Sequence, residues 1–407
     1  AGELSPRGSP GGPAGGSPAQ QQGGGGPEPA APRQGGRGAQ GATGWTFELS
    51  VVMVTPEAVM EPLVEAAHCV IIASGTLAPA AWFTAELGAA FAGRALEGPP
   101  VQAGHIIQPS QLGLVFVGRA SSGRELRCVR ESMTHRAFAQ ALGQTLVELI
   151  SAIPGGVLVF LPSRAMLDAV NRFWSDAPAG AGRSVWQALQ DSKGHLVIEG
   201  SGADARRALD DHQRAVERDG SCVFFGVYRG RASEGISLSD DSVRGVVCVG
   251  IPLAPLRPEV RLRRDYRNAL AQAAPAPGAP RGPAQARLSG DDWYQLQAHR
   301  AVNQALGRVI RHREDYGVCA LVDWRWTARG SLRAVRYLPL WLRQLVGIHD
   351  GVRGENADFA LEHVVRQVRG HFANHLHRSS QGYAAGADAP GVLSGEDASR
   401  QVRPRRH

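Results

Sequence analysis

The chain has 407 residues, with 44 Lys and Arg against 37 Asp and Glu, and its formal net charge is +7. This length favours two domains. No apolar run is long enough to span a membrane, so we expect neither a membrane protein nor a membrane partner. Lys193 is the one lysine, so arginine supplies the positive charge, and planar guanidinium groups suit bidentate contact with phosphate.

Five cysteines stand far apart, in or beside apolar runs, and no CxxC pair occurs. Zinc sites typically contain closely spaced cysteine pairs, whereas separated cysteines in apolar surroundings are typical of buried thiols. We therefore expect reduced core thiols and no metal site. The five residues are Cys69, Cys128, Cys222, Cys248 and Cys319.

Three stretches have compositions that favour disorder. Residues 1–44 are rich in Gly and Pro and have few large apolar side chains, so burial could not offset the entropy lost on ordering. We expect a disordered arm there. A Pro- and Ala-rich stretch indicates a disordered insertion at about 271–288, and the polar end, 395–407, is expected to be loose. The initial Ala1 indicates a piece of a longer protein.

Six short apolar runs alternate with helical patterns between these stretches. Their near-continuous hydrophobicity is typical of strands that are buried on both faces. This alternation predicts an α/β fold with a parallel sheet flanked by helices. The predicted strands are 69–74, 114–118, 156–163, 222–228, 245–250 and 318–323, and the clearest helices are 134–153, 164–174 and 204–219.

Ligands of parallel α/β sheets bind at the carboxyl ends of strands. Four segments there are rich in hydroxyl groups, glycine and arginine, which contact phosphates. They are SGTLAP (74–79), LPSR (161–164), RGRASEGISLSDD (229–241) and QALGRVIRHR (304–313). The plain alternative for Ser74, Thr76 and Ser163 is that they cap loops.

The fourth segment predicts a helix with one polar face. At about 100° per residue, Arg300, Gln304, Gly307 and Arg311 share one sector, with Arg308 beside it. A solvated arginine face is the alternative. A glycine in mid-helix costs about 1 kcal/mol relative to alanine, and here it would lie in the polar sector, where it lets a ligand approach closely. The pattern favours arginines that grip a polyphosphate.

These segments resemble motifs III to VI of superfamily 2 DNA helicases of the Rad3/XPD type, in the branch of the Fanconi anaemia group J and telomere elongation helicases. The most specific stretch is DDWYQLQAHRAVNQALGRVIRHREDYG, residues 291–317. The resemblance covers about residues 46–347. It implies a RecA-like fold of the P-loop NTPase type, with the tail of a first domain at 45–104, a second domain at 105–347 and a C-terminal extension at 348–407.

The resemblance also implies roles for individual residues. Three residues are expected to face ATP between two RecA-like domains: Gln304, Arg308 and Arg311. Arg311 is the expected arginine finger. Those expected to help bind the nucleotide are Glu234, Gly235 and Gly307. Those expected to contact the single-strand backbone are Ser163, Arg229 and Ser233. Those expected to couple hydrolysis to the DNA path are Ser74, Gly75 and Thr76.

The chain departs from the family's pattern in several places. Arg231 replaces a lysine, and Ser237 and Leu238 replace Asp-Phe, which removes a carboxylate. The chain contains no phosphate loop GxxxxGK[ST], no DEAH-like box and no four-cysteine cluster. We therefore expect ATP and Mg²⁺ as cofactors with the Mg²⁺ ligands outside this chain. A 4Fe–4S cluster is expected of the family, but its cysteines are absent here.

Two functions remain open from the sequence. The first is the C-terminal portion of an ATP-dependent DNA helicase, 5′→3′ in polarity, that couples ATP hydrolysis to single-strand translocation and fork unwinding in DNA repair. This chain alone would be inactive, because the Walker motifs are missing. The second is a non-catalytic nucleic-acid-binding or regulatory fragment. The resemblance implies a nuclear location, DNA as the partner, and repair or telomere proteins as further partners.

Overall fold

The computed structural model describes residues 49–74, 80–96, 106–176, 178–179, 182–200, 204–230, 240–273, 288–327, 334–345 and 360–380. Residues 52–407 form one compact unit, and residues 1–51 form another, of which the structure describes residues 49–51 alone. The expected arm at 1–44 and the insertion residues 274–287 lie outside the described residues. In the described part of the chain, no helix is both long and apolar enough to cross a membrane.

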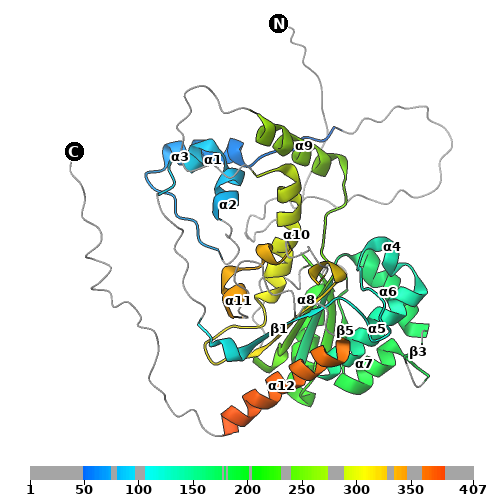
Figure 1. Cartoon of the computed structure of the whole chain (residues 1–407). Helices are drawn as coiled ribbons and strands as arrows, with labels where there is room; N and C mark the ends of the chain where they lie inside the picture. The colour runs from blue at the N-terminus through cyan, green and yellow to red at the C-terminus, as the bar shows by residue number, and fades with distance from the viewer. Residues whose placement is uncertain are drawn as a thin grey trace, which may run out of the picture. The chain divides into compact units, whose positions relative to one another are not determined.

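A six-stranded sheet forms the centre of the unit that begins at Val52 (Figure 1). Every neighbouring pair of strands is parallel, which confirms the predicted α/β class. In spatial order the strands are β1 (Leu112–Val117), β8 (Gly317–Val322), β7 (Gly245–Val249), β2 (Gly156–Leu161), β6 (Cys222–Val227) and β5 (Leu196–Ile198). A separate antiparallel pair consists of β3 (Pro178–Ala179) and β4 (Arg183–Ser184).

Burial explains which apolar runs became strands. All residues of β2, β7 and β8 are buried, as expected for strands with a neighbour on each side and helices on both faces. Five of the six predicted strands are present, and β5, a short and partly buried edge strand, was missed. The predicted strand at 69–74 is wrong. It has no described strand beside it, and Ile71 is 88% exposed.

Helices cover both faces of the sheet. The three predicted helices are confirmed, with the first one shorter than expected because Thr134 ends a preceding turn of helix. The helices are α1 (Glu57–Ala66), α2 (Ala80–Leu87), α3 (Ala89–Gly93), α4 (Arg130–Met133), α5 (Arg136–Ser151), α6 (Arg164–Asp176), α7 (Val185–Lys193), α8 (Asp204–Asp219), α9 (Pro258–Gln272), α10 (Gly290–Leu306), α11 (Leu340–Leu345) and α12 (Leu361–Ser380).

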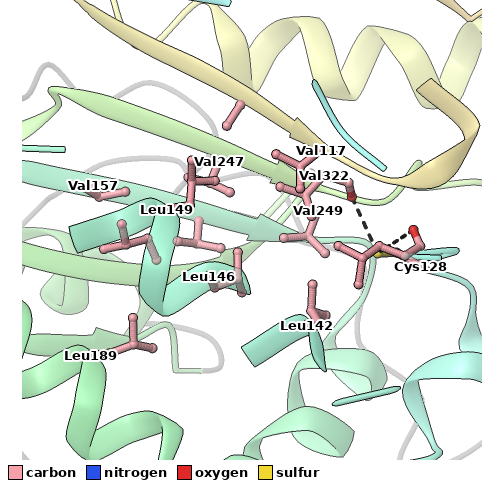
Figure 2. Packing of buried hydrophobic residues seen from close by; sticks show 14 of the residues in the cluster. Val117, Cys128, Leu142, Leu146, Leu149, Val157, Leu189, Val247, Val249 and Val322 are labelled. Atoms are coloured by element: carbon pink, nitrogen blue, oxygen red, sulfur yellow. Dashed lines mark hydrogen bonds between the residues drawn. The ribbon is translucent and has the colours of Figure 1, made fainter. Parts of the chain in front are cut away.

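Two hydrophobic clusters lie on opposite faces of the sheet, because successive side chains of a strand point to opposite faces. Val157 and Val159 of β2 belong to the cluster under α5, α6, α7 and α12, part of which Figure 2 shows. Leu158 and Phe160 belong to the other cluster, under α8 and α10. The fold is therefore a three-layer α/β/α arrangement, in which all strand carboxyl ends meet at one edge.

Candidate functional site

The predicted site residues lie at two opposite edges of the sheet. Ser163 follows the end of β2 and Arg229 follows the end of β6, so both lie at the carboxyl edge. The segment 307–316 leads directly into Gly317, the first residue of β8, and so lies at the amino edge. The expectation that all four segments lie at strand carboxyl ends is therefore wrong for the fourth one, and it is wrong for the first one because residues 69–74 form no strand.

Ser163 begins helix α6 at the carboxyl edge. Its Oγ accepts a hydrogen bond from the backbone N–H of Met166 at 3.3 Å, and its carbonyl accepts from Met166 and Leu167. The capping role that the sequence left open is thus present. The hydroxyl group also has a proton to donate, and the side chain is only half-buried. Ser163 can therefore cap α6 and still donate to a ligand oxygen.

Arg229 has an unusual backbone conformation. Its φ of 59° lies in the left-handed region, and it is the one described non-glycine residue with a positive φ. Such a conformation costs about 1–2 kcal/mol for a residue with a Cβ. The side chain is exposed, and its Nη2 donates to the carbonyl of Gln297 in α10 at 2.5 Å. Partial desolvation lowers the pKa of the guanidinium, yet arginine remains charged at neutral pH.

Glu199 and Arg164 support the turn that carries Arg229, and sequence reasoning missed both. Glu199 is buried, and its Oε2 accepts the backbone N–H of Val227 at 2.8 Å. Arg164 donates to the carbonyls of Glu199 and, at 2.7 Å, Gly200. Arg164 belongs to the segment LPSR (161–164), three residues after the end of β2, whereas Glu199 directly follows β5, a strand that the sequence did not predict. The ends of β2, β5 and β6 are thereby tied together.

Five predicted site residues lie outside the described residues, and they are Gly75, Thr76, Ser233, Glu234 and Gly235. The substituted positions Arg231, Ser237 and Leu238 also lie outside them. Ser74 is described and is exposed. The predicted roles of these residues in coupling, nucleotide binding and strand binding therefore stay predictions.

At the amino edge, helix α10 ends earlier than the sequence predicted. Its last residue is Leu306, and Gly307 is the C-cap with a φ of −64°. The expectation of a glycine in mid-helix is wrong, because the N–H groups of Arg308 and Val309 bond three residues back, at 3.1 and 3.3 Å. Such bonding tightens and closes a helix end. Gln304 is exposed on the last turn.

The three arginines of the predicted polar sector have different environments. Arg300 forms an ion pair with Glu86 of α2 at 2.7 Å, with side-chain exposures of 22% and 13%. It therefore joins α2 to α10. Arg308 and Arg311 are half-buried and lie beyond the helix, in the segment that leads to β8. The structure thus separates Arg300 from Arg308 and Arg311, the two arginines that the family resemblance implied beside ATP.

Asp315 fixes the segment that carries Arg311. Its Oδ2 accepts the backbone N–H of Arg311 at 3.1 Å, and its Oδ1 accepts Nη1 of Arg244 at 2.7 Å. The side chains of Arg244 and Asp315 are only 8% and 1% exposed. Gln111 also donates to the carbonyls of Arg313 and Asp315, both at 2.8 Å. A buried pair of this kind holds its surroundings firmly, because loss of one partner leaves an uncompensated charge.

The chemistry that these groups can supply is the binding of anions. Guanidinium groups suit phosphate oxygens, and Asp315 holds the backbone of the segment that carries Arg311. Among the described residues, no group of three or more His, Cys, Asp or Glu side chains could hold a metal ion.

Residues 146–344 match the family described as Helicase C-terminal domain. Regulator of telomere elongation helicase 1 of Pongo abelii is 33% identical over 359 residues, which cover 87% of this chain and 25% of that protein. The homolog of Oryza sativa subsp. japonica is 34% identical over 284 residues, which cover 68% of this chain and 26% of that protein. The chain therefore spans about a quarter of the length of these curated relatives.

Among solved structures, one described as XPD_Helicase is 16% identical and covers 55% of this chain and 34% of its own, with a TM-score of 0.38. At that score the likeness adds nothing to the fold, which rests on the topology of the sheet itself. Residues 146–344 therefore belong to the helicase C-terminal domain family, and most of the chain is similar to regulator of telomere elongation helicase 1 and its homolog.

Proposed function

We propose that this chain is the C-terminal helicase portion of an ATP-dependent DNA helicase. In this proposal, ATP and Mg²⁺ bind between this domain and a preceding RecA-like domain that supplies the Walker motifs. Binding of ATP closes the two domains and hydrolysis opens them, and the alternating grip moves a single DNA strand in the 5′→3′ direction. The proposed setting is DNA repair or telomere maintenance in the nucleus, and the names of the relatives mention telomere elongation.

The observation that carries the proposal is the arginine segment at the amino edge, within the residues that match the helicase family. Gln304, Arg308 and Arg311 would contact the γ-phosphate region, with Arg311 as the finger that stabilises transition-state charge. Asp315 supports this role, because it holds the backbone of Arg311 in place before any ligand binds. Gly307 would let the nucleotide approach, and Glu234 and Gly235 would help to bind it.

The carboxyl edge of the sheet would hold the single DNA strand. Ser163, Arg229 and Ser233 would contact the phosphates of the DNA strand. Phosphate contacts position a nucleic acid without reading its sequence, so the domain is expected to bind many sequences. Ser74, Gly75 and Thr76 would couple this edge to hydrolysis. The strained φ of Arg229 supports a functional role, since strain persists where the surrounding structure requires it.

A chimera tests the proposal, because hydrolysis needs the Walker half. Residues 106–380, which contain the whole six-stranded sheet and α12, would replace the matching region of one of the relatives, and DNA-stimulated ATP hydrolysis would be measured. Arg311→Ala is expected to slow hydrolysis by about 10³-fold or more, the usual contribution of an arginine finger. Binding of single-stranded DNA should change less than twofold, because Arg311 lies at the opposite edge from Ser163 and Arg229.

Arg313→Ala is the matched control, since Arg313 is exposed and lies two residues further on, and its side chain forms an ion pair with Glu314 at 3.6 Å. It removes the same charge and should leave hydrolysis near the unmodified rate. Equal losses in the two variants would mean that general positive charge matters and that Arg311 is no finger. A chimera that folds and binds DNA but never hydrolyses ATP would favour the non-catalytic alternative.

A further inference from the structure

The carboxyl edge of the sheet continues past Ser163 to a second group of residues that the proposed function does not use. After β1 the chain turns back on itself through a bridge between Arg119 and Glu125, and it then passes the end of β8. There the guanidinium of Arg127 lies over the ring of Trp324, with Cζ 4.9 Å from the ring centroid. Arg127 is exposed and Trp324 is half-buried.

The backbone on both sides of Arg127 is fixed to the segment that carries Trp324. The carbonyl of Leu126 accepts the N–H of Trp324 at 2.9 Å, and Asp323 Oδ2 accepts the N–H of Cys128 at 3.0 Å. The thiol of Cys128 lies 3.5 Å from the carbonyl of Val322, as Figure 2 shows. Arg127 and Trp324 are therefore presented as a preformed pair and do not meet by chance on mobile loops.

The charge of Asp323 is neutralised within the fold and does not oppose a polyanion. Arg325 donates from Nε and Nη2 to the two carboxylate oxygens of Asp323, each at 2.9 Å, and Asp323 is fully buried. The segments 118–131 and 323–325 together contain five arginines and three carboxylates. Arg124 and Arg130 are exposed and form no ion pair with a described residue. The surface around Arg127 is accordingly positive.

This surface is continuous with the strand-binding residues of the proposed function. Gly250, just after β7, is packed so closely that an added Cβ would lie 2.8 Å from Pro162 and 3.0 Å from the carbonyl of Cys128. Pro162 precedes Ser163, and Cys128 follows Arg127. From β6 to β8 the edge spans roughly 14 Å, at about 4.8 Å for each neighbouring strand. One nucleic-acid strand can therefore lie along both groups.

We propose that Arg127 and Trp324 form a base-stacking position for single-stranded DNA, which extends the strand path from the ends of β6 and β2 to the ends of β8 and β1. This inference rests on the proposed function, because it requires that single-stranded DNA binds at the carboxyl edge. Bases stack on guanidinium planes and on aromatic rings without regard to sequence. The position would hold one base of the strand, whereas Ser163 and Arg229 would hold its phosphates.

The test uses the full chain and two labelled probes of equal length, an oligo(dT) and the same backbone without bases, with affinity measured by fluorescence anisotropy. Arg127→Ala and Trp324→Leu are each expected to weaken oligo(dT) binding about tenfold, which corresponds to about 1.4 kcal/mol. Both should change binding of the base-free probe less than twofold. Trp324→Phe should restore much of the loss, because a ring is retained.

Arg214→Ala is the charge-matched control on the outer face of α8, where the side chain is 70% exposed. It should affect neither probe, and Arg229→Ala should weaken both. Equal losses on the two probes in Arg127→Ala would overturn base stacking. Full oligo(dT) affinity in Arg127→Ala, together with a loss in Arg229→Ala, would overturn this inference and leave the proposed function intact. An unmodified chain that binds neither probe would overturn the proposed function itself.

Discussion

Gly307 lies exposed at the end of α10, where its φ of −64° is one that alanine adopts without strain. An added Cβ would meet nothing nearer than the carbonyl of Asn303 at 3.4 Å, which is ordinary contact. Gly307→Ala is therefore expected to raise the free energy of unfolding by roughly 0.4–1 kcal/mol, because alanine has less backbone freedom to lose. Urea unfolding would measure this.

The same substitution tests the nucleotide role of Gly307. If ATP approaches the helix end closely, the added methyl group should slow ATP hydrolysis in the chimera by about tenfold while the fold becomes more stable. A loss of activity with a gain in stability cannot come from unfolding. Unchanged hydrolysis would mean that the nucleotide does not approach at this residue. Gly307 would then serve only to end α10.

At the scale of single elements, α8 and α10 each bury one histidine. Nε2 of His212 lies 2.8 Å from the carbonyl of Ser242, and Nδ1 of His299 lies 2.7 Å from that of Gln295. Burial lowers the pKa of each imidazole to about 4, against about 6.5 in an unfolded chain. Each nitrogen contact opposes this shift but does not cancel it.

The sign of the resulting pH dependence follows from these pKa values. Between about pH 6.5 and pH 4 the unfolded chain binds protons that the folded chain does not. The contribution of the two neutral, buried histidines to the free energy of unfolding is therefore complete above pH 6.5. It is lost as the pH falls through 4, by at most roughly 3 kcal/mol for each histidine. Urea unfolding near pH 7 and near pH 4.5 would measure the difference. His212→Gln and His299→Gln should each reduce it, and an unchanged difference in both variants would contradict the assignment.

At the scale of the whole molecule, α12 completes the core although it lies beyond the matched residues 146–344. Leu361, Val364, Val368 and Phe372 are at most 4% exposed and belong to the cluster that contains α5 and one face of the sheet. Phe372 also contacts the ring of Tyr316, just before β8, with centroids 6.2 Å apart. The helix therefore packs against the edge that carries the arginine segment.

Phe372→Ala is expected to lower the free energy of unfolding by about 3–5 kcal/mol, the usual result of truncating a buried aromatic side chain. Arg369→Ala, one turn away on the exposed face of α12, should stay within about 0.5 kcal/mol. Both can be measured by urea unfolding of the full chain. A loss below about 1 kcal/mol in Phe372→Ala would mean that α12 is not part of the cooperative unit.

Much of the fold was predictable from local sequence patterns. Apolar runs at 156–163, 222–228, 245–250 and 318–323 identified four strands, because a strand buried on both faces needs apolar residues in succession. The run at 69–74 carries the same signal without forming a strand, since a strand also needs a neighbour that accepts its hydrogen bonds. The residue types after the strands also indicated where ligand contacts should be sought.

The sequence by itself determined the α/β class, the parallel sheet and the identity of the arginine segment. Only the tertiary structure decided that this segment lies at the opposite edge from Ser163 and Arg229, and that Asp315 and Arg244, 71 residues apart, hold it. The pairing of Gly245 with Val318 between β7 and β8 brings those two side chains together. Local patterns follow from the spacing of side chains along one element, whereas such contacts depend on strand register between distant segments.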